Sequence, residues 1–284
     1  MIRTFDPAML NSPHSALDLI PFLPLAGFQA VSLTPDLLED PLRAAKAKEE
    51  ASSRGIGFGL LPMPADFYHW ELSDAGFDRA LEELKRRAEI AERLGAKAGY
   101  NHVWPASTRP FEENFAWHVS RVARVAGVLR EHGIRYGLEF LGPHELRSLA
   151  PYRFLHSLEG ILSLADAAGN GVGVAFDTFH WFTSEGGDPK DLGTMTEKAD
   201  RLVCVHLNDA VAGVPFDRQK DMVRRFPMET GVIDSRAILR GFREAGSDAL
   251  FMIEPFEPGR TLFHALSPEE AARRAGEILR RVEE

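Results

Sequence analysis

The sequence predicts a single α/β domain over residues 1–284 with the architecture of a (β/α)8 TIM barrel, and three observations support this. A unit of amphipathic helix, glycine-marked turn and short apolar strand recurs along the chain. The recurrence yields eight strands separated by helical segments, as a barrel of parallel strands requires. No stretch resembles a linker or a low-complexity segment. A doubly wound open sheet is the alternative, but eight even units fit it less well.

The repeated unit is clearest in residues 80–101. Leu81, Leu84 and Ala88 recur at spacings of three and four, and Gly95 ends the predicted helix. Further units are expected over residues 18–34, over a helix stopped at Gly133, over 161–177 and over 235–256, and a last helix over 268–284. The predicted strands are residues 2–6, 29–33, 56–61, 97–101, 134–140, 172–177, 202–206 and 250–254.

Composition and charge narrow the class of protein. The chain is 44% hydrophobic and 26% charged, which is typical of a globular domain with a sizeable core. A net charge of −9 argues against a nucleic-acid partner, which normally needs a basic face. The one cysteine, Cys204, allows no disulfide and fits a reducing compartment. The N-terminal residues lack a signal-peptide layout and no run reaches 18 apolar residues, so we expect a cytoplasmic protein with no membrane partner.

Four consecutive predicted strands end in polar residues, namely Glu139, Asp177, His206 and Glu254. In a barrel of this kind, reactive groups lie at the carboxyl ends of the strands, where the loops converge. One carboxylate at a strand end can instead be a helix N-cap. Three carboxylates facing one opening would repel each other unless a cation lay between them. Together with one imidazole, they predict a site for a single divalent ion such as Mn, Mg, Co or Zn.

Other polar and aromatic residues near these strand ends are candidates for binding a substrate. His180 lies three residues beyond Asp177 and is expected in the following loop, next to Trp181. His102 follows the fourth strand, and His69 lies in the loop after the third; a structural role remains open for both. Asp209 lies just beyond the end of the seventh predicted strand and is the remaining candidate.

The longest irregular segment, residues 208–234, is a candidate active-site loop. By contrast, His118 and His132 fall on the helix after Phe111 and are expected to face solvent. Competing motifs do not occur: the chain has neither GxSxG nor GxxxxGK[ST]. The glycine runs GIGFG and GNGVG precede strands, so they do not form the strand-to-helix turn of a phosphate-binding loop.

The stretches GLEF, FDTFH, VHLND and IEPF, together with FPMETGVID, resemble the sugar isomerase and epimerase barrels of the xylose isomerase-like superfamily. This group includes 2-keto-myo-inositol isomerase and D-tagatose 3-epimerase. The resemblance covers most of the chain and is strongest over residues 137–256. It implies that Glu139, Asp177, His206 and Glu254 bind one metal ion, and that the two glutamates are also the catalytic acid/base pair. It further implies that His180 contacts substrate oxygens and, by analogy with relatives, that the protein forms a homo-oligomer.

The resemblance implies proton transfer through a metal-stabilised enediolate of a sugar or keto-polyol. Ketose epimerases of this group have an arginine six residues after the strand-seven histidine. That position is Ala212 here and the nearest arginine is Arg218, which favours an inosose-like substrate.

Three alternatives remain beside an isomerase or epimerase. A dehydratase would use the same metal site but expel a β-hydroxyl. Endonuclease IV shares the barrel, but it holds three zinc ions and carries a DxH motif after strand seven. Met228, Glu229 and Thr230 occupy that region here. The third alternative is a non-catalytic sugar-binding barrel, because a fold alone does not establish a function.

Overall fold

Eight parallel strands form a curled sheet in the computed structural model, which describes residues 1–169 and 171–284. The sheet order is β3-β2-β1-β10-β9-β8-β6-β4. A parallel bridge between Leu60 and Ala98 joins the segment after β3 to β4 and closes the sheet into a barrel. The predicted (β/α)8 barrel is therefore confirmed. The strands are β1 (Ile2–Phe5), β2 (Ala30–Val31), β3 (Gly57–Phe58), β4 (Ala98–Val103), β6 (Arg135–Phe140), β8 (Gly173–Asp177), β9 (Leu202–Leu207) and β10 (Leu250–Ile253).

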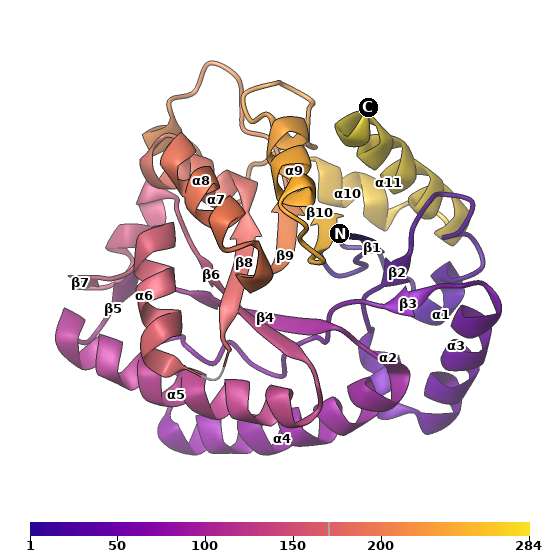
Figure 1. Ribbon diagram of the computed structural model, residues 1–284, viewed down its shortest axis with the longest axis horizontal. Helices are drawn as coiled ribbons and strands as arrows, with labels where there is room; N and C mark the ends of the chain where they lie inside the picture. Colours follow the sequence, from indigo (N-terminus) through magenta and orange to yellow (C-terminus); the bar gives the residue numbers. More distant parts are fainter. Residues whose placement is uncertain (170) are drawn as a thin grey trace.

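Helices surround the barrel on its outside (Figure 1). The Ser73 side chain caps the first turn of α4. The helix ends at Gly95, whose left-handed backbone conformation, at φ 85°, favours glycine. Asn170, within the repeated unit predicted over residues 161–177, lies outside the described residues. The helices are α1 (Ala16–Leu19), α2 (Pro35–Glu39), α3 (Pro41–Ser53), α4 (Asp74–Leu94), α5 (Phe111–Glu131), α6 (Leu158–Ala168), α7 (Thr178–Glu185), α8 (Pro189–Glu197), α9 (Ser235–Glu244), α10 (Gly259–His264) and α11 (Pro268–Glu283). Short 3-10 turns are η1 (His144–Ser148), η2 (Ala199–Arg201) and η3 (Phe216–Arg218).

Two features of the fold differ from the prediction. The helix expected before Gly27 is limited to α1, and turns follow it, because Pro21 and Pro24 cannot continue a helix. A small antiparallel pair, β5 (Ala106–Ser107) and β7 (Tyr152–Arg153), joins the loops after β4 and β6. Its strands have two residues each, too short for a periodic pattern to reveal.

Apolar side chains fill two layers. A small cluster inside the barrel contains Met9, Ala175, Cys204 and Met252, and a larger one lies between the barrel and the helices. The inner cluster fills the barrel below the strand ends, so the barrel is a packed core rather than a pore. Within the described residues, no helix is both long and apolar enough to cross a bilayer.

His118 is buried, contrary to the expectation that it faces solvent. Its ring packs against Tyr68, Trp117 and Phe154 at centroid distances of 4.6 to 5.5 Å. Nδ1 lies 2.8 Å from the Asn114 carbonyl oxygen, whereas Nε2 is buried without a hydrogen-bond partner. The residue lies on the face of α5 that meets the barrel, where a polar ring interrupts the apolar pattern. Burial lowers the pKa of His118 to about 3.

This burial predicts a loss of stability in acid. The unfolded chain binds the His118 proton near pH 6.5 and the folded chain only near pH 3, so stability is complete above that window and declines as the pH falls through it. Between pH 6.5 and 4.5, we expect His118 to account for about 2 kcal/mol of lost unfolding free energy. Urea denaturation across this range measures the effect. His118→Gln should show a shallower pH dependence, and the exposed His264→Gln should not; equal slopes for His118→Gln and the wild type would contradict the prediction.

Candidate metal centre

Glu139, Asp177, His206 and Glu254 meet at the carboxyl end of the barrel. Glu139 and Asp177 lie on β6 and β8, His206 lies on β9, and Glu254 directly follows β10. Because β6, β8, β9 and β10 are neighbours in the sheet, their ends bring the four side chains together. One ligand atom from each residue lies within 4.8 Å of the others, and all four residues are buried. The four side chains therefore lie together at one rim of the barrel, where the sequence placed them.

Asp177 has two structural contacts besides its place in this cluster. Its Oδ1 accepts the backbone N–H of His180 at 2.8 Å and caps α7, and its Oδ2 accepts Asn208 Nδ2 at 2.7 Å. The N-cap role and the cluster role are therefore compatible, because the two oxygens of one carboxylate face different partners. This cap begins a helix where the sequence suggested a loop.

Arg224 is the cluster residue that the sequence did not reveal. It comes from the segment between β9 and α9, and its Nη1 donates to Asp177 Oδ2 at 2.9 Å and to Glu254 Oε2 at 3.0 Å. Nη2 donates to Asp221 Oδ1 at 2.8 Å. The guanidinium is 2% exposed and lies over the Phe256 ring at 4.3 Å. A buried cation thus contacts two of the three cluster carboxylates and holds the 208–234 segment against the site.

The pKa values of the two cluster glutamates move apart. Burial opposes ionisation of Glu139, but the charges of His206 and His102 outweigh it and hold the pKa of Glu139 well below its ordinary value. At Glu254, by contrast, burial is the largest effect. The charges of Asp177 and Glu139 reinforce it, and the pKa of Glu254 rises to about 8. The site therefore places a carboxyl that ionises readily, Glu139, and one that ionises with difficulty, Glu254, near the same nitrogen of His206.

His206 is held between Glu139 and Cys204. Its Nδ1 lies 2.9 Å from Glu139 Oε1 and 3.8 Å from Glu254 Oε2, and its Nε2 lies 3.5 Å from Cys204 Sγ. Burial opposes protonation of this ring, but the charge of Glu139 raises the pKa of His206 above its ordinary value. Nδ1 therefore faces the carboxylates and is the nitrogen available to a metal ion, while the thiol fixes the orientation of the ring.

These residues fit a divalent cation. Three carboxylates and one imidazole form a donor set that Mn, Mg, Co or Zn accepts. Glu139 Oε2 is buried without a hydrogen bond; it lies 3.1 Å from His102 Nε2, but outside hydrogen-bond geometry. This oxygen therefore relies on the charge of His102, whose pKa Glu139 raises, and a metal ion held by the four residues would supply a second positive charge beside it. A divalent-metal centre is therefore compatible with the side chains of this chain.

His102 links the cluster to an adjoining pocket of about 270 Å³, named here the mouth pocket. The pocket lies at the ends of β1 to β4 and is lined by Asp6, Met9, Ser32, Asp66, Tyr100 and His102, among others. The Tyr100 ring packs 4.8 Å from the His206 ring. Although burial opposes protonation, Glu139 raises the pKa of His102, and solvent screens part of this effect because 40% of the side chain is exposed. The prediction that His102 faces the rim agrees with this position.

His180 also reaches the cluster. Its Nε2 lies 3.1 Å from Arg224 Nη2, and the backbone N–H of Gly142 donates to its Nδ1 at 3.3 Å. A Cβ at Gly142 would come within 2.0 Å of the His180 carbonyl oxygen, so only glycine allows this approach. The pKa of His180 is lowered by burial and by Arg224, which favours a neutral imidazole.

Three predicted substrate contacts lie elsewhere. Trp181 points away from the cluster, donates from Nε1 to the Asp188 carbonyl at 3.1 Å and packs near Phe176. It does so because α7 is helical, and one helical step turns a side chain by about 100° from the preceding one.

Asp209 is fully buried, and its carboxylate accepts hydrogen bonds from the backbone N–H groups of residues 210, 230, 231 and 233. It therefore organises the loop instead of facing a ligand.

His69 does not contact the cluster either. Its ring stacks on Trp70 at 4.2 Å and meets Trp104 edge-on at 5.3 Å. Trp104 in turn donates from Nε1 to Asp66 Oδ2 at 2.5 Å, and Asp66 lines the mouth pocket. His69 thus lies behind the wall of that pocket, one aromatic layer from any ligand within it.

The barrel and its rim cluster define a class of protein, the (β/α)8 barrels with a buried carboxylate–histidine cluster that could hold a metal ion. The family model described as xylose isomerase-like TIM barrel matches residues 24–282, and the chain belongs to this family. No protein of curated function matches the sequence.

Several solved structures share the fold. A xylose isomerase domain protein from Alicyclobacillus acidocaldarius is 27% identical, with a TM-score of 0.79 over 99% of this chain and 98% of its own. An IolI protein with a bound zinc atom is 18% identical, with a TM-score of 0.76 over 99% of this chain and 98% of its own. D-psicose 3-epimerase from Clostridium cellulolyticum, solved with D-tagatose, is 16% identical, with a TM-score of 0.71 over 99% and 98%.

Proposed function

We propose that this protein is a divalent-metal-dependent isomerase or epimerase of an unphosphorylated sugar or keto-polyol. The observation that carries the proposal is the buried cluster of three carboxylates and His206, which adjoins a pocket whose mainly apolar lining includes Asp6 and Asp66, at the carboxyl end of the barrel strands. Glu139, Asp177, His206 and Glu254 would hold the ion. When bound, the ion would act as a Lewis acid toward the carbonyl and neighbouring hydroxyl oxygens of the substrate.

The two glutamates would move the proton. Glu139 and Glu254 both lie beside His206, whose Nδ1 is 2.9 Å from Glu139 Oε1 and 3.8 Å from Glu254 Oε2. One carboxylate would remove the proton from the carbon next to the carbonyl, and either the same or the opposing carboxyl would return it. Return to the other face inverts the centre, and return to the neighbouring carbon moves the carbonyl. His180 and Arg224 would orient substrate oxygens at the same rim.

The mouth pocket favours an uncharged, hydroxyl-rich substrate. Asp66 lines this pocket, and its carboxylate would accept a hydrogen bond from a substrate hydroxyl. Asp6 adds a second carboxylate to the lining, and none of the described residues that line the pocket is lysine or arginine. Arg224 offers no phosphate site, because its donors already face Asp177, Glu254 and Asp221. A phosphate group in the pocket would meet two carboxylates, while His102 in the same lining is already paired with Glu139.

The similar solved structures give independent support, since they include D-psicose 3-epimerase with D-tagatose and an IolI protein with zinc. A nuclease of the three-zinc type fits less well. Among the described residues, the side chains that could hold a metal ion form one group of four, and the chain carries a net charge of −9. The barrel therefore has the ligands for one ion and lacks the positive charge that DNA phosphates need.

Deuterium exchange tests the proposal. Protein loaded with Mn²⁺, Co²⁺ or Zn²⁺ is incubated in deuterated water with D-tagatose, D-fructose and 2-keto-myo-inositol, and NMR follows the proton next to the carbonyl. We expect exchange, with an isomer or epimer appearing, for at least one unphosphorylated compound, and slower exchange for its phosphate ester. Loss of a hydroxyl instead of isomer formation would assign a dehydratase. Absence of exchange with every keto-polyol and metal would overturn the isomerase proposal.

A further inference from the structure

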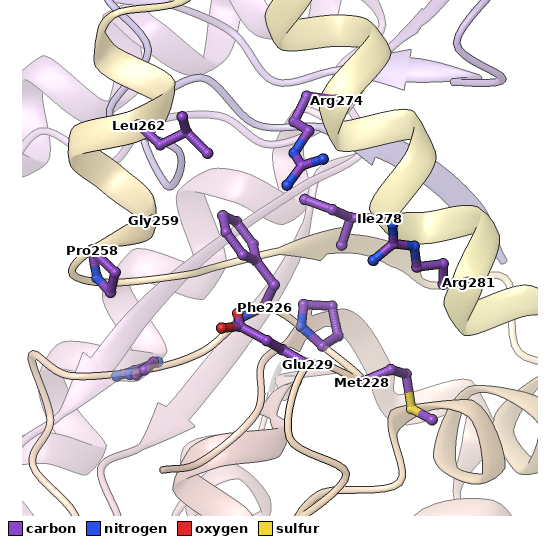
Figure 2. Close-up of a pocket in the computed structure, with 11 residues that line it drawn as sticks. Phe226, Met228, Glu229, Pro258, Gly259, Leu262, Arg274, Ile278 and Arg281 are labelled. Atoms are coloured by element: carbon purple, nitrogen blue, oxygen red, sulfur yellow. The ribbon is translucent and has the colours of Figure 1, made fainter. Parts of the chain in front are cut away.

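A second cavity, of about 420 Å³, lies outside the barrel rim, and we name it the α11 pocket. The residues that form it come from the loop after β9, from the turn before α10, from α10 and from α11. Figure 2 shows Arg274 and Arg281 extending from α11 toward the space above Phe226, with Leu262 on the opposite wall. Its size suits a small organic molecule.

The walls of this pocket combine positive charge with apolar surface. Arg281 is exposed, and its guanidinium makes none of the ion pairs found among the described residues. Arg274 Nη1 lies 3.8 Å from Glu277 Oε2, but the other oxygen of Glu277 binds Arg273 at 2.5 Å. Both lining arginines can therefore turn to an anion without breaking a close ion pair. Phe226, Leu262 and Ile278 supply the apolar surface.

Glu229 is the one acidic residue among the described residues that line the pocket, and one of its oxygens already accepts a hydrogen bond. Glu229 Oε2 accepts the backbone N–H of Phe226 at 3.0 Å, which ties it to its own loop. The formal charge of the lining is positive, because Arg224, Arg274 and Arg281 face this single glutamate. Arg224 is paired within the metal centre, so the two helix arginines are the groups left for a ligand.

We propose that the α11 pocket is a second binding site, separate from the metal centre, for an organic anion with an apolar body and a carboxylate or phosphate head group. The head group would bind Arg274 and Arg281, and the body would pack on Phe226, Leu262 and Ile278. The ligand would contact the loop that carries Arg224 two residues before Phe226. The inference does not depend on the proposed isomerase activity, because it concerns binding alone.

Fluorescence of anilinonaphthalene sulfonate, an aromatic anion, tests the site directly in the full-length protein. We expect saturable binding to the wild type and at least tenfold weaker binding to an Arg274→Ala, Arg281→Ala double variant, since each charge-assisted contact contributes substantially to affinity. Leu262→Glu, which places negative charge on the opposite wall, should weaken binding as well. Circular dichroism melting verifies that the variants fold.

A different pocket, which lies between α3 and α4, provides the matched control. The cavity between α3 and α4 is lined by Lys48 and Arg93 together with apolar side chains such as Leu37 and Ile90. Lys48 Nζ already donates to the Arg93 carbonyl oxygen at 2.5 Å, so this pocket offers fewer free donors than the α11 pocket. A Lys48→Ala, Arg93→Ala double variant removes the same charge and should bind the probe as the wild type does. Displacement of the probe by octanoate would assign a carboxylate head group and displacement by phenyl phosphate a phosphate. Equal binding by the wild type and the Arg274, Arg281 variant, or displacement by neither competitor, would overturn the proposal.

Discussion

Replacing Glu254 by glutamine should leave the barrel folded but reduce divalent-metal affinity by on the order of a hundredfold or more. Glutamine has the same shape as glutamate but lacks its negative charge, so one of four donors is weakened and one half of the acid/base pair is lost. Proton exchange should fall by roughly a hundredfold to ten-thousandfold. The fold should persist because Arg224 keeps its contacts with Asp177 and Asp221.

Elemental analysis after identical reloading measures the metal content, and NMR in deuterated water measures the exchange. About one ion per wild-type chain, reduced in Glu254→Gln, is the expected result. Glu244→Gln, at the exposed end of α9, is the matched control and should behave as the wild type. Near three zinc ions per wild-type chain would indicate a nuclease-type centre instead. Equal metal content in Glu254→Gln and the wild type would show that Glu254 is not a ligand.

The four cluster residues could be predicted from the sequence because a simple rule relates strand ends to the barrel rim. Parallel neighbouring strands must end at the same edge, so any polar residue that terminates an apolar run is brought to that edge. Glu139, Asp177, His206 and Glu254 each satisfy this rule. The rule says nothing about residues in long loops, whose paths depend on tertiary contacts.

Arg224 illustrates this limit. The sequence drew attention to Arg218 because of its distance from His206, yet Arg218 lies exposed in η3 and Arg224, six residues later, enters the cluster. The loop turns back because Asp209 binds four of its backbone N–H groups and pairs with Arg225. The available signal was the sequence FPMETGVID after Arg224, which marked this segment but not its direction.

Trp181 and His118 were mispredicted for a related reason. Asp177 caps a helix at once, so the side chain after His180 rotates out of the site instead of continuing along a loop. His118 lies on a helix whose buried face also includes Asn114 and Arg121, and a polar residue on a buried face defeats a hydrophobic pattern. For Trp181 a helix stands where a loop was expected, whereas for His118 the helix was predicted correctly and only the facing of the side chain was wrong.

Replacing Arg224 by methionine should destabilise the protein strongly when divalent metal is removed by a chelator. The guanidinium contacts Asp177, Glu254 and Asp221, and the first two of these carboxylates are buried. Removing one partner of a buried ion pair costs about 3 to 5 kcal/mol, because the remaining charge is left uncompensated. Urea denaturation in chelator measures the loss. Arg218→Met, an exposed position in the same segment, should change the unfolding free energy by about 0.5 kcal/mol or less.

A divalent ion should recover part of the stability lost in Arg224→Met. Asp177 and Glu254 lie within reach of both the guanidinium and a cation at the cluster, so each positive charge relieves the same repulsion. Added Zn²⁺ or Mn²⁺ should therefore raise the unfolding free energy of Arg224→Met more than that of the wild type or Arg218→Met. If the ion stabilises all three proteins equally, the guanidinium and the metal act on separate groups, and the four cluster residues do not form one charge-balanced centre with Arg224.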